Sequence, residues 1–448
     1  MKSPTVGFAI WMAMIPYLAF AQAEKLQAGP MVGYSTMQEA GVWVQTDRPA
    51  DVSIRYWSEN DSTHLYQSSV ISTNAAQAYT AHLIADSLQP GHRYRYLLYI
   101  DNIEIERPYK LSFTSQPLWQ YRNDAPDFSF ALGSCMYINQ PEYDRPGKPY
   151  GRGYHIFNSI LEKQPHFMLW LGDNVYLREA DWNSRAGIYG RYTHDRSISE
   201  LQPLLGSVHH YAIWDDHDYG PNNSDRSFWN KEITAEAFRR FWYNPNYGQS
   251  GGNDISGTFF WNDVQFFLLD DRWYRAPNSM EDKNKPLLGQ NQMRWLKDAL
   301  LFSQAPFKII VMGGQVINPA QDGENYASYP SERQQLLDFI KEENIPGILF
   351  LSGDRHFTEL SMLQHDSYPL YDLTVSPLTS GVVSPDEEQN TCRVKGTLIS
   401  QQNFAVVQVS GRKGDRSLNI TVYDDEGSTL WQKTINQNLL NKNETEGG

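Results

Sequence analysis

Six short apolar segments recur between residues 128 and 351, and they restrict the fold more than any other feature of the chain. Each is too short to cross a membrane and is rich in β-branched or aromatic side chains, which is typical of strands buried on both faces. Amphipathic stretches at residues 154–163 and 292–301 lie between some of these segments and predict helices. The alternation predicts an α/β domain, which we place at residues 121–440. The six segments are residues 128–132, 167–171, 211–214, 264–269, 307–312 and 347–351.

A different rhythm precedes this domain. Alternating apolar and polar residues at 40–46, 51–57, 79–83 and 88–100 are separated by turn residues, which predicts a small antiparallel β-sandwich at residues 24–120. The pattern Leu-x-Pro-Gly-x-x-Tyr-x-Tyr at residues 88–96 resembles the corner of a fibronectin type III domain. Such a likeness indicates a fold and no activity.

Residues 1–23 have the pattern of a secretory signal peptide. Lys2 precedes an apolar stretch from Val6 to Phe20, and small residues follow in the Ala-x-Ala spacing of a cleavage site. We therefore expect export to the periplasm or the medium. No other segment is long and apolar enough to span a bilayer, so no stable membrane insertion is expected, and we expect a monomer.

The formal net charge of −14 bears on the class of partner. A surface with this excess of carboxylates repels polyanions, which argues against nucleic-acid binding. An anionic substrate would have to be attracted locally, by metal ions.

Polar residues of metal-binding type follow the apolar segments. Asp354 and His356 come directly after residues 347–351, and a carboxylate and an imidazole are good ligands for divalent ions. In α/β enzymes the binding and catalytic residues usually lie on the loops that follow the carboxyl ends of the strands. The other strand-end motifs are Gly133-Ser134-Cys135, Gly172-Asp173-Asn174-Val175-Tyr176, Asp215-Asp216-His217-Asp218 and Gly313-Gly314-Gln315.

The order of these motifs, followed by Leu-Thr-Val-Ser-Pro-Leu-Thr-Ser at residues 373–380, resembles alkaline phosphatase D (PhoD-like) enzymes of the metallophosphoesterase superfamily. The resemblance runs from about residue 128 to 410, and the preceding β-sandwich matches the domain order of that family. It implies a layered α/β/β/α sandwich and a phosphoric ester hydrolase acting on phosphomonoesters, phosphodiesters or both. The chemistry agrees, because a pair of metal ions can clamp a phosphoryl group and lower the pKa of a bridging water.

The resemblance also implies roles for individual residues. Asp173 bridges two metal ions, one of them iron, and Asp216 binds the second ion. Asp354 and His356 complete the two sets of ligands, with Asp354 at the iron and His356 at the second ion. His217 faces the phosphate as proton donor or stabiliser of the transition state. Asp218 orients the His217 imidazole by hydrogen bonding to its other nitrogen.

Cys135 and Tyr176 are unusual metal ligands. A thiolate and a phenolate need a strongly Lewis-acidic ion at neutral pH, because the free groups titrate at about 8.5 and 10. By resemblance that ion is Fe³⁺, with Ca²⁺ or another divalent ion beside it. Cys392 is then a spare thiol, whereas the structural alternative is a disulfide between the two cysteines of an exported chain.

Arg178 departs from the family pattern, which commonly has an acidic residue at this position. A calcium site built on that carboxylate would need Glu179 or Asp181 instead, and Arg178 or Arg191 would be free to bind phosphate. Asn223 and Gln315 are further candidates for substrate or metal contacts.

Two other functions fit the same sequence. One is a phospholipase-like diesterase on the same metal core, for which the aromatic content permits an apolar rim. The other is a catalytically silent surface protein that binds glycans or partners and contains no metal.

Overall fold

Two β-sheets packed face to face form the centre of the computed structural model, which describes residues 25–321, 324–364, 368–385 and 389–441. The larger sheet contains β1 (Leu26–Ser35), β2 (Ala40–Thr46), β6 (Thr80–Ala85), β10 (Phe128–Gly133), β11 (Phe167–Leu171), β12 (His209–Ile213), β19 (Asn403–Arg412), β20 (Asp415–Asp424) and β21 (Thr429–Asn436). Its nine strands follow the order β21-β20-β19-β10-β11-β12-β1-β2-β6. The second sheet contains β13 (Gly257–Trp261), β14 (Val264–Leu268), β15 (Lys308–Val311), β16 (Ile348–Ser352), β17 (Glu359–Leu363) and β18 (Leu370–Thr374). Its order is β13-β14-β15-β16-β18-β17.

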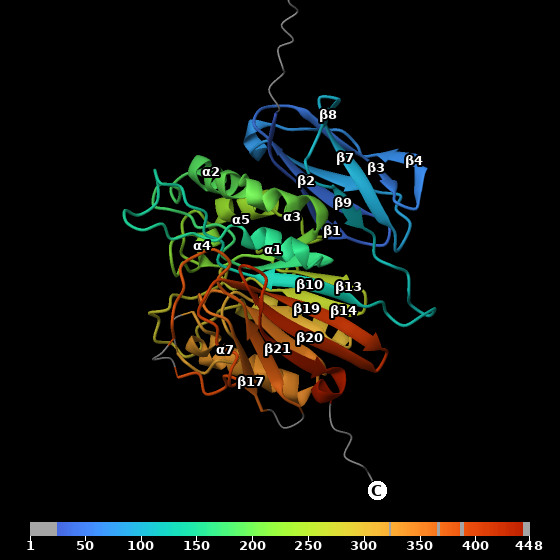
Figure 1. Ribbon diagram of the computed structural model, residues 1–448. Helices are drawn as coiled ribbons and strands as arrows, with labels where there is room; N and C mark the ends of the chain where they lie inside the picture. Colours follow the sequence, from blue (N-terminus) through green and yellow to red (C-terminus); the bar gives the residue numbers. More distant parts are fainter. Residues whose placement is uncertain (1–24, 322–323, 365–367, 386–388, 442–448) are drawn as a thin grey trace, which may run out of the picture.

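Helices cover the outer faces of this pair of sheets. In Figure 1 the green helices lie on the side of β10 that faces the blue N-terminal strands, and α7 lies at the opposite side of the molecule. The predicted α/β/β/α layering is therefore confirmed. The helices are α1 (Ile156–Glu162), α2 (Arg185–Arg196), α3 (Gln202–Ser207), α4 (Asp216–Tyr219), α5 (Lys231–Phe241), α6 (Gly289–Phe302) and α7 (Pro330–Glu342), with short 3-10 turns η1 (Ala75–Gln77), η2 (Ser199–Leu201), η3 (Tyr326–Ser328) and η4 (Gln437–Leu440).

Aromatic rings join the two sheets. Phe167 of β11 packs edge-on against Phe266 of β14 with ring centroids 5.4 Å apart, and Tyr211 of β12 stacks on Phe259 of β13 at 3.7 Å. Large rings buried in such stacked and T-shaped contacts contribute both apolar area and specific geometry. The apolar segments predicted from the sequence thus form the interior between the sheets.

The predicted small β-sandwich is also confirmed. Its outer sheet contains β3 (Asp51–Ser58), β4 (Asp61–Gln67), β5 (Ile71–Ser72), β7 (Arg93–Ile100), β8 (Ile103–Ile105) and β9 (Ser112–Thr114). Buried apolar residues from β3 and β7, such as Ile54 and Leu98, pack in one core with Val42 and Val44 of β2. The sequence pattern did not show how the sandwich joins the second domain. β1 pairs in parallel with β12, so the other sheet of the sandwich, formed by β1, β2 and β6, is continuous with the large sheet of the α/β domain.

His209 lies at this junction. Its Nδ1 is 2.7 Å from the carbonyl oxygen of Gly33 in β1, and its Nε2 is 3.0 Å from the backbone N–H of Thr114 in β9. Because an N–H group can only donate, Nε2 accepts and the ring is neutral. One buried imidazole therefore joins β12 to both sheets of the sandwich.

The C-terminal strands close the edge of the large sheet, as predicted. β19 pairs antiparallel with β10, and β20 and β21 continue outward from it. No helix within the described residues is long and apolar enough to cross a membrane. The predicted signal peptide at residues 1–23 lies outside the described residues.

Candidate metal centre

The candidate ligands meet where the carboxyl ends of β10, β11, β12 and β16 converge. β10, β11 and β12 run parallel in one sheet, and β16 brings its own terminal loop from the other. The two sheets approach so closely here that a Cβ at Gly353 would lie 2.6 Å from Cβ of Ser134 and 2.7 Å from the carbonyl oxygen of Leu171. Only glycine fits at that position, which explains the residue before Asp354.

The backbone at this centre is unusual. Cys135, Asp173, Asp354 and His356 have φ values of 60°, 53°, 64° and 56°, in the left-handed region that residues with a Cβ rarely adopt. Such conformations persist where the surrounding structure enforces them, and they cluster at functional sites. Because four predicted ligands share this conformation, we infer that the backbone of these loops orients their side chains toward the centre.

The first group of ligand atoms comprises Cys135, Asp173 and His356, which lie within 4.8 Å of one another. The Cys135 thiol is 3.6 Å from Oδ2 of Asp173, and the Tyr176 hydroxyl is 3.0 Å from the same oxygen. The Tyr176 hydroxyl also lies 3.2 Å from Nε2 of His356. The structure thus brings a thiol, a phenol, a carboxylate and an imidazole to one point.

The second group comprises Asp173, Asp216 and His217. Oδ1 of Asp173 accepts a hydrogen bond from the backbone N–H of His217 at 3.2 Å, while its Oδ2 faces the first group. The His217 ring packs against the Tyr176 ring at a tilt of 31°, with centroids 4.2 Å apart. The Asp173 carboxylate therefore lies between the two groups, as a bridging ligand would.

The third group comprises Asp215, Asp216 and Asp354. Oδ1 of Asp216 and Oδ2 of Asp215 are buried without a hydrogen-bond partner among the described residues. Buried carboxylate oxygens normally have a hydrogen-bond donor or a cation. This group consists of carboxylates alone, a donor set that suits Ca²⁺, Mg²⁺ or Mn²⁺.

The structure exchanges the expected positions of Asp354 and His356. His356 lies with Cys135 and Asp173, whereas Asp354 lies with Asp215 and Asp216. The prediction that Asp354 belongs to the thiol side and His356 to the other side was wrong. Both residues have positive φ, so the alternation of side chains along an extended segment does not apply to this loop.

Burial and mutual repulsion dominate the electrostatics of the centre. Burial raises the pKa of the Cys135 thiol to about 11, and burial together with Asp216 raises the pKa of Asp173 well above its usual range. Burial, with Asp173 as the next cause, also raises the pKa of Tyr176. Burial opposes ionisation of Asp216 as well, yet His217 and Arg272 hold its pKa below the usual range. A bound cation would stabilise the ionised forms of these neighbouring acidic groups. The thiol, phenol, imidazole and carboxylates present are suitable ligands for such a cation.

Asp218 occupies a different position from the one predicted. Its carboxylate accepts hydrogen bonds from the backbone N–H of Asn174 at 3.1 Å, from the Asn174 side chain at 3.1 Å and from the backbone N–H of Asp215 at 3.0 Å. Among the hydrogen bonds of the described residues, none joins Asp218 to the His217 imidazole. Asp218 instead links the loop after β11 to the loop after β12.

Arg272 is a part of the centre that the sequence analysis did not identify. It is fully buried, and its Nε donates to Oδ1 of Asp215 at 2.6 Å while its Nη2 donates to Glu324 at 2.5 Å. Arg272 follows β14, one of the predicted strands, in the polar run Asp270-Asp271-Arg272. Polar residues after that strand were the available signal.

Arg178 makes contacts that leave its guanidinium little freedom to bind phosphate. It donates to Asp144 at 3.0 Å, to the carbonyl oxygen of Ile138 at 2.7 Å and to the carbonyl oxygen of Tyr176, and it stacks on the Tyr137 ring at 4.0 Å. A phosphate-binding role would require these contacts to break.

The alternatives to Arg178 are engaged as well. Asp181 accepts from Arg191 at 3.0 Å, and Glu179 pairs with Arg145 at 2.9 Å on the surface, so neither carboxylate belongs to the three ligand groups. Arg191, the other arginine expected to be free for phosphate, also pairs with Asp195 at 3.5 Å, so it is engaged by two carboxylates of the protein.

Gln315 and Asn223 differ in their surroundings. The Gln315 amide donates to Glu359 and to Thr374, both at 2.8 Å, and its oxygen accepts from Asn318, so its hydrogen-bonding capacity is used within the protein. Asn223 is exposed, and its backbone N–H donates to Oδ2 of Asp216 at 2.5 Å. Asn223 therefore contacts the centre through its main chain.

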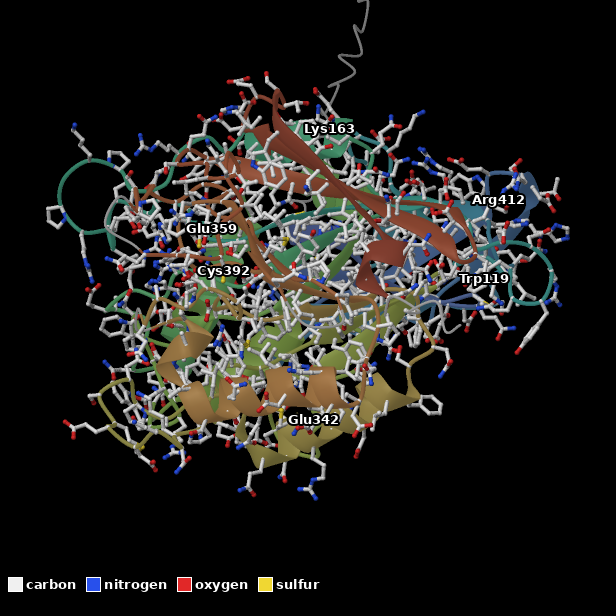
Figure 2. All side chains as sticks on the ribbon, turned by 90° about the horizontal axis from the view of Figure 1, so that it is seen from below. Trp119, Lys163, Glu342, Glu359, Cys392 and Arg412 are labelled. Carbon is white, nitrogen blue, oxygen red and sulfur yellow. The ribbon has the colours of Figure 1, made fainter. Side chains whose placement is uncertain are left out.

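Cys135 and Cys392 are both free thiols, so the alternative of a disulfide between them does not hold. Cys392 lies beside Glu359 (Figure 2), whose carboxylate is held by Asn390 and Arg393 on either side of that cysteine in the chain. Its thiol belongs to none of the three ligand groups.

Comparisons with known families agree with this geometry. The sequence profile of the PhoD-like phosphatase family matches residues 130–422, which confirms the resemblance noted in the sequence. A profile described as a domain of unknown function (DUF7800) matches residues 23–118.

Individual relatives are distant. Alkaline phosphatase D of Bacillus subtilis (strain 168) is 24% identical over 345 residues, which cover 64% of this chain but only 55% of that protein. The chain thus matches about half the length of this curated relative.

Two solved structures share the fold. A structure of PhoD superposes with a TM-score of 0.75 at 16% identity, covering 94% of this chain and 93% of the other. The purple acid phosphatase PPD1 from yellow lupin (Lupinus luteus) seeds superposes with a TM-score of 0.68 at 11% identity, covering 91% of this chain and 74% of the other.

Proposed function

The chain belongs to the PhoD-like phosphatase family, and on that premise we propose that it is a metal-dependent phosphoesterase that hydrolyses phosphomonoesters, phosphodiesters or both. One observation carries the proposal. Asp173 and Asp216 each belong to two of the three ligand groups, so the groups form one continuous centre with shared carboxylates. Shared carboxylates are what a pair of neighbouring metal ions requires.

The donor types suggest which ions bind. Cys135, Asp173, Tyr176 and His356 offer a thiolate, a carboxylate, a phenolate and an imidazole, a set that suits Fe³⁺. Asp216 and Asp354 offer only oxygen, which suits Ca²⁺ or another divalent ion. Two ions bound there would neutralise the phosphoryl oxygens and lower the pKa of a bound water so that it can attack phosphorus.

The residues of the chain have separable tasks in this proposal. His217 has a partly exposed imidazole beside the Asp173 and Asp216 carboxylates, and it gives a proton to the leaving oxygen. Asp218 keeps the loops after β11 and β12 together, which fixes the distance between Asp173 and His217. Arg272 neutralises Asp215 so that a third charge does not repel the substrate.

The proposal includes the location and the organisation of the chain. Residues 1–23 are a signal peptide and the enzyme is exported. Residues 24–120 form the β-sandwich domain and residues 121–440 the catalytic domain.

Hydrolysis of 4-nitrophenyl phosphate and of bis(4-nitrophenyl) phosphate by the purified protein tests the function. Asp173→Asn is the decisive variant, because it removes the charge of the bridging carboxylate and keeps its shape. Asp415→Asn, at the exposed first residue of β20, is the matched control. We expect activity to be lost in Asp173→Asn and after chelation and to be unchanged in Asp415→Asn. Full activity of Asp173→Asn would overturn the proposal, and a protein that contains no metal and hydrolyses neither ester would favour the silent binding protein.

A further inference from the structure

Tyr150 lies at the edge of the metal centre, on the segment between β10 and α1. Its hydroxyl is 3.1 Å from Nδ1 of His356, and its ring centroid is 6.0 Å from the centroid of that imidazole. The ring also packs edge-on against Tyr137 at 4.9 Å. In spite of these contacts Tyr150 is 43% exposed, so it forms a wall that solvent and ligands can reach.

The hydrogen bonds of His356 show what the Tyr150 hydroxyl can do. Nδ1 of His356 lies 2.6 Å from the carbonyl oxygen of Gly381, which can only accept, so Nδ1 carries the proton and Nε2 is the free nitrogen, 3.2 Å from the Tyr176 hydroxyl. A protonated Nδ1 cannot accept a hydrogen bond from Tyr150. Among the described residues the hydroxyl hydrogen of Tyr150 therefore has no acceptor, and it is available to a ligand.

A second set of contacts fixes the segment that carries Tyr150. Arg178 bonds to Asp144 at 3.0 Å, and Asp144 accepts from the Tyr137 hydroxyl at 2.9 Å and from the backbone N–H of Gln140 at 2.7 Å. Arg178 is two residues beyond the ligand Tyr176 and is buried. The segment is thus tied to the same loop that holds Tyr176.

The backbone opposite Tyr150 leaves no room for movement toward the protein. A Cβ at Gly381 would lie 2.5 Å from Cε2 of the Tyr150 ring, so the ring lies directly on the main chain that accepts from His356. The ring is therefore held on one side by Gly381 and open on the other.

From these contacts we propose that Tyr150 is a substrate-contacting residue whose hydroxyl donates a hydrogen bond to a phosphoryl oxygen bound at the metal centre, and that the Arg178–Asp144 ion pair holds it in place. The inference rests on the proposed function, because it assigns a residue to the recognition of the same phosphate. It gives Arg178 a task as an anchor of the segment and not as a phosphate ligand.

Tyr150→Phe is the direct test, since it removes one oxygen and keeps the ring. Tyr143→Phe is the matched control, because Tyr143 lies on the same segment, is 48% exposed and has no hydrogen-bond partner for its hydroxyl among the described residues. Three quantities are measured on the metal-loaded protein: the Kd of inorganic phosphate by calorimetry, KM and kcat for 4-nitrophenyl phosphate, and metal content. Asp144→Asn weakens the anchor and is measured in the same way.

We expect the phosphate Kd and KM of Tyr150→Phe to rise about tenfold, the usual effect of losing one hydrogen bond to a charged group, with kcat and metal content close to wild type. Asp144→Asn should change Kd in the same direction, and Tyr143→Phe should change nothing. An unchanged phosphate Kd in Tyr150→Phe would overturn the inference. A loss of metal in that variant would also overturn it, because Tyr150 would then serve His356 alone. If the wild type binds phosphate but hydrolyses no ester, the proposed function fails while the Kd comparison still decides the role of Tyr150.

Discussion

The thiol of Cys135 lies 3.6 Å from Oδ2 of Asp173, although the two residues follow different strands and are 38 positions apart in the chain. Parallel pairing of β10 with β11 places the ends of these strands side by side. The Ser376 hydroxyl, from the loop after β18, donates to the same sulfur at 3.1 Å. A buried thiol between a carboxylate and hydroxyls fits the ligand role that we propose for Cys135, and this cysteine is not in a disulfide.

The first prediction concerns the colour of the protein. Cys135→Ser should abolish or strongly shift the visible absorption of a ferric ion bound by a thiolate and a phenolate. It should also reduce the iron content below about one ion per chain, because serine is not ionised at neutral pH. Cys392→Ser is the matched control and should keep both properties. Absorption spectra and elemental analysis measure them. A colourless, active wild type would refute the iron assignment and leave hydrolysis standing.

The second prediction concerns His217. His217→Asn should lower kcat by about 10²- to 10⁴-fold, the usual contribution of a general acid, while both metals are retained. The loss should be smaller for esters whose leaving group is a weak base, because these need less proton donation. His64→Asn is the control, since this histidine lies on β4 with a side chain 72% exposed. An equal loss for all leaving groups would contradict the role of proton donor.

The third prediction concerns stability at low pH. Burial lowers the pKa of His209 to about 4 and that of His210 to about 3, and His210 accepts a hydrogen bond from the Trp170 indole at 2.9 Å. In the unfolded chain both titrate near 6.5, so between these values the unfolded state binds more protons and the free energy of unfolding falls as pH falls. Each histidine should account for about 2 kcal/mol of the loss between pH 7 and pH 5.

Urea unfolding at pH 7 and pH 5 measures this effect. His210→Gln retains a donor and an acceptor but cannot gain a proton, so its unfolding free energy should depend less on pH than that of the wild type. Gln67→Asn, at an exposed position of β4, adds or removes no titratable group, so its unfolding free energy should depend on pH as that of the wild type does. Equal pH dependence of wild type and His210→Gln would show that another group is responsible.

The fourth prediction concerns Arg272. Arg272→Met should destabilise the fold by about 3–5 kcal/mol, because it leaves the buried carboxylate of Asp215 without its counter-charge and leaves Glu324 with Arg275 alone. Arg185→Met removes an arginine from an ion pair with Glu236 at 2.8 Å whose side chains are 46% and 36% exposed, and it should cost about 1 kcal/mol or less. Equilibrium unfolding in urea compares the two. A similar, small effect of both substitutions would contradict a structural role for the buried network.

Much of the fold was predictable because it depends on local patterns. The apolar segments at residues 128–132, 167–171 and 347–351 are strands β10, β11 and β16 to within a residue or so at each end, since their length and composition permit little else. The parallel pairing of β1 with β12 was not predictable. It joins Val32 to His209, residues far apart in the chain, and no local pattern encodes such a contact.

The sequence by itself determined which residues could form the centre, because chain order alone places Cys135, Asp173, Asp216 and Asp354 directly after buried strands. Only the tertiary structure decided which of them meet. It grouped His356 with Cys135, turned Asp218 toward backbone amides, and tied Arg178 to Asp144. These outcomes depend on left-handed turns and on the approach of two sheets, and both are set by contacts between distant parts of the chain.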